Sequence, residues 1–305
     1  MIDDPSAGPA AIATLGVVGA GFMGSGIAES AARAGIRVLV YEPGRPALER
    51  SRASVLASVE RAVATGKLEE AEAKELIARV SWQTEIEALA DADLVIEAVV
   101  EDPQVKAALF ADLDRLLPEG TVLASNTSSI PIAQLASATA RPDRVLGLHF
   151  FSPVPVMKLV EVVVALDTSL ETIEIAQAFV HQIGKRPIRT KDRSGFIVNM
   201  LLVPYLMAAV RMYEDGFASR EDIDAGMKLG CGHPMGPLAL CDFIGLDVLY
   251  AVCDSLYEEF KRDEYAPPPL LKRMVAAGRL GRKSGLGFYD YAAAPAAAAL
   301  ADTRA

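Results

Sequence analysis

The sequence of 305 residues predicts an α/β fold. Its N-terminal domain is expected to be a Rossmann-type, doubly wound, mostly parallel sheet with a helical hairpin insertion. An all-helical C-terminal domain is expected to follow it. Short apolar runs alternate with helical patterns as far as Thr190. A glycine-rich turn follows the first run, in the order strand, tight turn, helix, and strand signals cease after residue 191. We therefore expect domains at 12–190 and 191–291, with flexible tails at 1–11 and 292–305.

Seven apolar runs have the length and composition of strands. They span residues 13–18, 36–41, 94–100, 121–125, 144–149, 157–164 and 186–190. Helical periodicity predicts helices at 25–34 and 170–183, and a projecting helical pair within 46–80 that is broken at residues 65–67. In the second domain the same periodicity predicts helices at 194–213, 219–229 and 237–261.

Charge and composition exclude several classes of function. Forty acidic against 30 basic residues give a net charge of −10, which argues against a nucleic-acid partner. The N-terminus has no secretory signal pattern, and the most apolar stretch, residues 197–210, is shorter than the roughly 20 residues of a membrane span. We expect a cytoplasmic protein with no membrane partner.

The three cysteines lack the spacing of a zinc site or a disulfide framework. They are Cys231, Cys241 and Cys253. We expect no metal, and we expect all three to be buried thiols.

A G-x-G-x-x-G motif occupies the turn after the first predicted strand. Its first glycine makes the turn, the second lets the backbone approach a pyrophosphate, and the third lets the helix pack close to the strand. The helix N-terminus then offers N–H groups and a positive dipole end to phosphates. The predicted dinucleotide contacts of this loop are Gly19, Gly21, Phe22, Met23 and Gly24. The alternative is a merely tight turn.

An acidic residue, Glu42, ends the second predicted strand about 20 residues after the motif, the spacing of a ribose-binding carboxylate. A carboxylate there repels a 2′-phosphate, so the motif predicts a Rossmann domain that binds NAD in preference to NADP. Arg45, three residues further on, softens that preference.

Several linked motifs, in order and with intact spacing from Thr14 to Tyr291, resemble those of the 3-hydroxyacyl-CoA dehydrogenases, and most closely the stand-alone bacterial 3-hydroxybutyryl-CoA dehydrogenases. They are G-A-G-F-M-G-S-G-I-A, I-E-A-V-V-E-D, S-N-T-S-S-I-P-I, G-L-H-F-F-S-P-V-P-V-M-K-L-V-E-V, D-R-S-G-F-I-V-N, H-P-M-G-P and K-S-G-L-G-F-Y. The resemblance implies NAD-dependent interconversion of (S)-3-hydroxyacyl-CoA and 3-oxoacyl-CoA, as in fatty acid β-oxidation, by a homodimer.

The resemblance implies that His149 is the catalytic acid and base and that Glu161 is its partner. A histidine can take the hydroxyl proton as hydride leaves the same carbon, and a carboxylate on its other ring nitrogen stabilises the imidazolium. Both lie at the ends of neighbouring predicted strands, the edge where open α/β sheets bind ligands. The alternatives are a core or surface histidine and a surface pair of Glu161 with Lys158.

The resemblance also implies that Ser128 and Asn199 contact the substrate oxygens. Neutral donors stabilise developing negative charge without competing for the proton. Alternatively, Ser128 is a helix N-cap before Pro131, and Asn199 is a hydrogen-bonded polar residue in an apolar helix.

Further NAD contacts implied by the resemblance are Glu101, Lys106, Ser128, Ser152 and Lys283. Ser152 stands where many members have asparagine, and a hydroxyl still donates one hydrogen bond. Glu101, Lys106 and Lys283 are alternatively solvated surface charges. For coenzyme A, the resemblance points to Ser58 and Lys67 in the helical pair.

Two other functions stay open at this point. One is a free hydroxy-acid dehydrogenase resembling L-gulonate 3-dehydrogenase, which uses the same type of fold. Activity with acetoacetyl-CoA but not with free hydroxy acids would identify the acyl-CoA dehydrogenase instead. A catalytically silent NAD-binding sensor needs no catalytic dyad, so the joint presence of His149, Glu161 and Asn199 argues against it.

Overall fold

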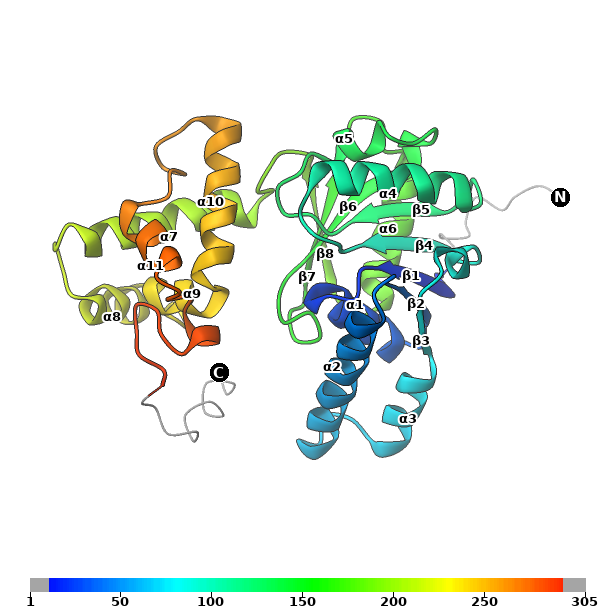
Figure 1. Ribbon diagram of the computed structural model, residues 1–305, viewed down its shortest axis with the longest axis horizontal. Helices are drawn as coiled ribbons and strands as arrows, with labels where there is room; N and C mark the ends of the chain where they lie inside the picture. The colour runs from blue at the N-terminus through cyan, green and yellow to red at the C-terminus, as the bar shows by residue number, and fades with distance from the viewer. Residues whose placement is uncertain (1–10, 293–305) are drawn as a thin grey trace. The chain divides into compact units, whose positions relative to one another are not determined.

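The computed structural model describes residues 11–292, and the chain divides after Phe196 into two compact units, 1–196 and 197–305 (Figure 1). The expected tails, 1–11 and 292–305, fall outside the described residues except for residues 11 and 292. None of the described helices is long and apolar enough to cross a membrane.

The first unit is built on an eight-stranded sheet in the order β3-β2-β1-β4-β5-β6-β7-β8. Its strands are β1 (Thr14–Val18), β2 (Arg37–Tyr41), β3 (Val80–Gln83), β4 (Leu94–Glu97), β5 (Val122–Ser125), β6 (Val145–Phe150), β7 (Leu159–Val164) and β8 (Arg186–Lys191). Every neighbouring pair is parallel except β6 and β7. The predicted doubly wound, mostly parallel sheet is confirmed.

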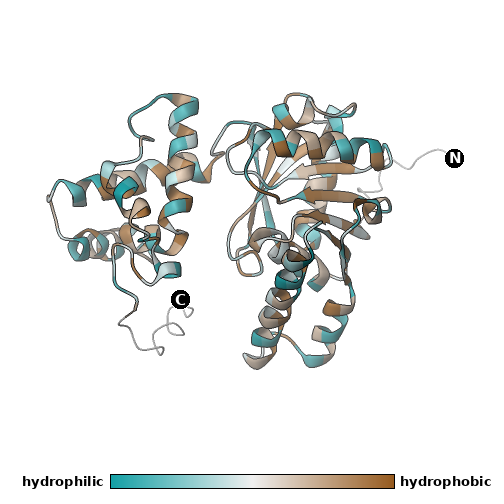
Figure 2. Ribbon diagram, in the orientation of Figure 1, coloured by the Kyte–Doolittle hydropathy of each residue, from teal (hydrophilic) through white to brown (hydrophobic). Residues whose placement is uncertain are grey.

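Helices cover both faces of the sheet. They are α1 (Phe22–Arg33), α2 (Arg45–Ala64), α3 (Glu70–Ala78), α4 (Pro103–Leu116), α5 (Ile132–Ala136) and α6 (Leu170–Gln182). One apolar core packs α1, α2, α3 and α6 on one face, and a second packs α4 and α5 on the other. Figure 2 shows the strands as the most hydrophobic part of this unit, which is expected for strands buried on both faces.

Strand β3 was missed by the sequence prediction, which placed residues up to Val80 in the helical pair. The helix ends at Ala78, and Val80 to Gln83 pair with β2 at the edge of the sheet. A four-residue edge strand with only one fully buried residue carries almost no periodic signal. The helical pair itself is confirmed, and Gly66, with φ +68°, makes the turn between α2 and α3.

Strand β4 ends at Glu97 and not at Val100 as expected. The Glu97 carboxylate accepts the N–H of Val99 at 2.7 Å, so the chain turns there and the apolar residues that follow are not part of the strand.

The second unit consists of α7 (Val198–Glu214), α8 (Arg220–Cys231), α9 (Pro237–Ile244), α10 (Leu246–Phe260) and α11 (Pro269–Ala276), packed around one apolar core. The expected all-helical domain is confirmed. The single helix predicted at 237–261 was wrong, because Gly245, with φ +100°, separates α9 from α10. Helix α11 was not predicted.

Candidate active site

The glycine turn between β1 and α1 has the geometry of a phosphate cradle. Gly19 has φ +100° and donates its N–H to the Tyr41 carbonyl at 2.9 Å. A Cβ on Gly24 would collide with the Gly19 carbonyl oxygen, so only glycine lets the helix start this close to the turn. A Cβ on Gly21 would meet no protein atom within 4 Å, so this face of the turn is open to a ligand.

Helix α1 begins beside that open face. Its first residue, Phe22, is two-thirds exposed, and its second is Met23. The first helical N–H groups have no partner within a helix, and α1 has no acidic side chain in its first turn. This end therefore favours an anion such as a pyrophosphate.

Glu42 lies at the rim of the same turn. Its Oε2 accepts the N–H of Ala20 at 3.4 Å and its Oε1 accepts the N–H of Gly44 at 3.2 Å. The carboxylate is half-buried, and these contacts hold it next to the glycines, where it can accept the hydroxyls of a ribose. The turn and this carboxylate fit an NAD adenosine and pyrophosphate.

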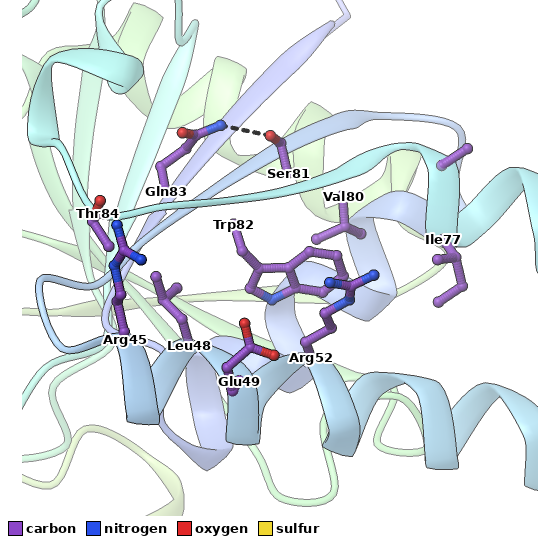
Figure 3. Close-up of a pocket in the computed structure, with 11 residues that line it drawn as sticks. Arg45, Leu48, Glu49, Arg52, Ile77, Val80, Ser81, Trp82, Gln83 and Thr84 are labelled. Carbon is purple, nitrogen blue, oxygen red and sulfur yellow. Dashed lines mark hydrogen bonds between the residues drawn. The ribbon is translucent and has the colours of Figure 1, made fainter.

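Arg45, the first residue of α2, is exposed and faces a separate groove of about 530 Å³ between α2 and the edge strand β3 (Figure 3). Trp82 forms one wall, and the Arg52 guanidinium lies 5.8 Å from the centre of its ring. None of the predicted contact residues lines this groove.

The candidate catalytic pair lies on adjacent antiparallel strands. His149 on β6 is directly opposite Glu161 on β7, and the His149 Nδ1 lies 2.7 Å from the Glu161 Oε2. Glu161 has no exposed surface, which excludes a pairing with Lys158 on the surface, and His149 is 7% exposed. A carboxylate at Nδ1 holds the proton there, so Nε2 becomes the basic nitrogen of the neutral ring.

Two aromatic rings flank the histidine. The Phe151 ring centre lies 4.6 Å from that of His149, and the Phe196 ring centre lies 5.4 Å from it. Phe196 has φ +47°, a backbone conformation that bulky residues rarely adopt. Phe196 was not predicted as a site residue, and its one signal in the sequence is its place after Gly195 in the D-R-S-G-F motif.

A buried ion cluster lies at the carboxyl ends of β4 and β5. The Lys106 Nζ is 2.6 Å from the Glu97 Oε1 and 3.1 Å from the Glu101 Oε2. Lys106 is 1% exposed, so the alternative of a solvated surface charge is wrong for this residue. Sequence reasoning missed Glu97, because the strand predicted at 94–100 made it a lone acidic residue in the middle of an apolar run.

Glu101 connects this cluster to Ser128. Its Oε1 accepts the Ser128 N–H at 3.0 Å and a hydrogen bond from the Thr127 hydroxyl. Burial alone would raise the pKa of Glu101, but the Lys106 ammonium and these hydrogen bonds outweigh it and hold the pKa below its ordinary value.

Ser128 is not the N-cap of α5. The carboxylate of Asp192, distant in sequence, accepts the first N–H groups of that helix, from Ile132 at 2.9 Å and Ala133 at 2.8 Å. Ser128 lies earlier in the same loop, half-buried. Its helix-capping alternative is therefore wrong, and the serine stays a candidate ligand contact.

The loop between β6 and β7 carries Ser152, which is exposed. The buried ammonium of Lys185 holds this loop by donating to the carbonyls of Val154 at 2.5 Å and Met157 at 2.7 Å. A Cβ on Gly26 of α1 would come within 2.8 Å of the Val154 side chain. The loop after the histidine thus packs directly on the helix that follows the glycine turn.

The remaining predicted contacts lie elsewhere. Ser58, half-buried on α2, hydrogen-bonds the buried Glu29 of α1, and Lys67 is exposed in the turn after α2. Asn199 and Lys283 belong to the second unit, where Asn199 is half-buried in the first turn of α7 and the Lys283 ammonium pairs with Asp247 at 2.6 Å.

No group of three or more His, Cys, Asp or Glu side chains within residues 11–292 is arranged to hold a metal ion. Cys241 and Cys253 are buried as expected, and burial raises the pKa of the Cys253 thiol to about 12. Cys231 is exposed, which corrects the expectation of three buried thiols, because it lies at the C-terminal end of the amphipathic helix α8.

Strands β1, β4, β5 and β6 are parallel, so the glycine turn, the ion cluster and His149 all lie along one edge of the sheet. Alcohol oxidation needs a proton acceptor on the same side of the fold as a hydride carrier. The first unit thus has the features of an NAD-dependent oxidoreductase.

Comparison with known proteins defines the family. Residues 14–193 match the NAD-binding domain of 3-hydroxyacyl-CoA dehydrogenase, and residues 195–291 match the C-terminal domain of the same enzymes. The chain therefore belongs to the 3-hydroxyacyl-CoA dehydrogenase family and is an NAD-dependent dehydrogenase.

Individual relatives cover nearly the whole chain. A 3-hydroxybutyryl-CoA dehydrogenase of Mycobacterium tuberculosis is 53% identical over 92% of this chain and 99% of its own length. A mitochondrial hydroxyacyl-coenzyme A dehydrogenase of Sus scrofa is 44% identical over 90% of each chain. The crystal structure of an (S)-3-hydroxybutyryl-CoA dehydrogenase from Ralstonia eutropha has a TM-score of 0.87 and 45% identity, over 92% of this chain and 99% of that one.

Proposed function

We propose that the chain interconverts (S)-3-hydroxyacyl-CoA and 3-oxoacyl-CoA, with short-chain 3-hydroxybutyryl-CoA as its substrate, as in a step of fatty acid β-oxidation. The observation that carries the proposal is the 2.7 Å contact between His149 and the fully buried Glu161 at the carboxyl end of β6. The names of the relatives with 53% and 45% identity support the substrate.

NAD, when bound, accepts the hydride that leaves C3 of the hydroxyacyl group. The backbone around Gly21 and the start of α1 would bind its pyrophosphate, and Glu42 would accept its ribose hydroxyls. On the family resemblance we assign further NAD contacts to Phe22, Met23, Glu101, Lys106, Ser128, Ser152 and Lys283.

His149 takes the substrate hydroxyl proton at Nε2 during oxidation and returns it during reduction. Glu161 holds the proton at Nδ1 and stabilises the imidazolium that forms. The Phe151 and Phe196 rings restrict the movement of the imidazole and exclude water from its sides. Ser128 and Asn199 act as neutral donors to the substrate oxygen.

We assign the CoA nucleotide to the α2 and α3 pair, with Ser58 and Lys67 as contacts. We also propose that the protein is cytoplasmic, and that it is a homodimer, as the family resemblance implies. Sedimentation equilibrium tests the dimer, since a mass near that of one chain would contradict it.

Initial rates of NADH oxidation with acetoacetyl-CoA test the proposed function. Parallel assays with longer 3-oxoacyl-CoAs, with NADPH and with free L-gulonate and NAD separate the alternatives. We expect the highest kcat/KM for acetoacetyl-CoA with NADH. Turnover of the free acid alone would favour the gulonate dehydrogenase alternative, and NADH binding without any turnover would favour a silent sensor.

A further inference from the structure

A lysine ammonium is buried beneath the loop that joins β6 to β7. Lys185 follows the turn at the end of α6 and is 8% exposed. Its Nζ donates to the Val154 carbonyl at 2.5 Å and to the Met157 carbonyl at 2.7 Å. The proton transfer assigned to His149 does not involve this ammonium.

The ammonium is paired with backbone carbonyls and not with a carboxylate. Within residues 11–292 no acidic side chain forms an ion pair with Lys185, and the Glu29 carboxylate of α1 acts on it only from a longer distance. Burial lowers the pKa of Lys185, and the Glu29 charge offsets only part of that effect. Lysines are rarely buried without an acidic partner, so the two carbonyl contacts are the main compensation for this burial.

The backbone of Lys185 is itself held firmly. Gly184, with φ +70°, follows the end of α6, and the Lys185 N–H donates to the Val180 carbonyl at 3.0 Å. The next residue, Arg186, begins β8 and donates its N–H to the Lys158 carbonyl at 2.6 Å. The ammonium therefore extends from a fixed point beside the sheet, and the loop is the part whose position it sets.

The loop lies between the strand of His149 and helix α1. The ring centre of Phe151, at the start of the loop, lies 4.6 Å from that of His149. Val154 is 2% exposed and packs on α1, because a Cβ on Gly26 would come within 2.8 Å of the Val154 side chain. The carbonyl of the same Val154 accepts the Lys185 ammonium. The ammonium thus contacts the loop at the point where the loop meets the helix that follows the glycine turn.

We propose that Lys185 is a positioning residue: its ammonium fixes the loop 151–157 against α1 and so keeps Phe151 against His149 in the geometry that transfers the proton. This role rests on the proposed function of His149 as acid and base. Removal of the ammonium leaves two carbonyls without their donor, so the loop gains freedom while every residue of the site is kept. The alternative is a purely structural lysine, whose loss lowers stability and leaves the rate unchanged.

The test compares wild type with Lys185→Met, which fills nearly the same space without a donor. Lys191→Met, on the exposed end of β8, is the matched control. Leu113→Ala, in the core on the other face of the sheet, supplies a destabilised variant in which Lys185 is intact. If Lys185→Met does not fold, Lys185→Gln takes its place, because glutamine keeps one donor group on a shorter side chain.

Thermal unfolding, NADH binding by fluorescence titration, and kcat with the 3-oxo compound that the wild type reduces fastest are measured for each variant. Rates are measured well below the melting temperature. Hydrogen exchange of the peptide 151–157 reports on the loop directly, because the N–H groups of Val156 and Met157 both donate to the Pro153 carbonyl at 3.0 Å.

We expect kcat of Lys185→Met to fall by about 10–100-fold, because a small displacement of reacting groups slows a reaction strongly. The loop amides should exchange faster than in wild type. NADH affinity should change little, since the Gly19 turn and Glu42 are unchanged. Lys191→Met should behave as wild type, and Leu113→Ala should lose stability but keep its kcat.

A wild-type kcat in the Lys185 variant, whatever its melting temperature, would overturn the proposal, and so would unchanged hydrogen exchange of the loop. An equal fall of kcat in Leu113→Ala would also overturn it, because lost stability alone would then explain the rate. An error in the proposed substrate would appear separately, in the wild type, as faster reduction of a compound other than acetoacetyl-CoA.

Discussion

His149 and Glu161 occupy opposing positions in the only antiparallel strand pair of the described sheet, twelve residues apart in the chain. Opposed residues in an antiparallel pair place their side chains on the same face about 5 Å apart. The register of β6 and β7 therefore brings the carboxylate to the ring nitrogen directly.

Replacing His149 with glutamine should lower kcat by about 10²–10⁴-fold, because the proton step loses its acid and base. NADH affinity should be retained, since the Gly19 turn is unchanged. Steady-state kinetics and NADH titration check this, with the exposed His181→Gln as the control. A near-normal kcat in His149→Gln would remove this histidine from the mechanism.

Replacing Glu161 with glutamine keeps a hydrogen-bond acceptor at Nδ1 but removes the charge that stabilises imidazolium. We expect kcat to fall and NADH affinity to change little. Glu174→Gln, on the exposed face of α6, should leave both unchanged. A normal kcat in Glu161→Gln would break the pair without affecting the dehydrogenase assignment.

Glu42→Ala should weaken the preference for NADH over NADPH, because the carboxylate that repels a 2′-phosphate is gone. The ratio of kcat/KM values for the two cofactors measures the effect, with Glu49→Ala on α2 as the control. A wild type that already prefers NADPH would contradict the role of Glu42.

Gly21→Ala should leave the melting temperature nearly unchanged, since the added methyl group meets no protein atom within 4 Å. It should raise KM for NADH, because the methyl group occupies the face where the pyrophosphate approaches. Gly226→Ala on α8, where a Cβ also meets no protein atom within 4 Å, is the control. If Gly21→Ala bound NADH normally, the phosphate contact would lie elsewhere.

The folded state lowers the pKa of Glu101, so the stability from this carboxylate is present above its ordinary pKa and is lost as the pH falls through the lower folded value. The stability difference between wild type and Glu101→Gln should shrink as the pH falls below about 4.5. Thermal unfolding against pH measures this.

The sheet was predictable from sequence because strands buried on both faces are apolar throughout, as in Leu94 to Ile96. The glycine turn was predictable because its conformations exclude other residues, as the φ of Gly19 shows. Strand β3 was not predictable, since an edge strand buries too little to need an apolar pattern.

The contacts around the site depend on residues far apart in sequence. Nothing near Lys106 indicates that its ammonium is buried against Glu97, since both residues also suit a surface. The capping of α5 by Asp192 joins segments about 60 residues apart and has no local pattern. Such contacts are set by the packing of the strands and not by local propensity.

The antiparallel β6 and β7 and their loop form one unbroken segment, residues 145–164. His149 and Glu161 are therefore inherited together, because recombination between related genes at points outside this segment cannot separate them. The same arrangement makes the pair sensitive to slippage, because a shift of β7 by one residue would turn Glu161 to the opposite face of the sheet. Deletion of Leu159 or Val160, which precede Glu161 in β7, would thus separate the pair while keeping both of its residues.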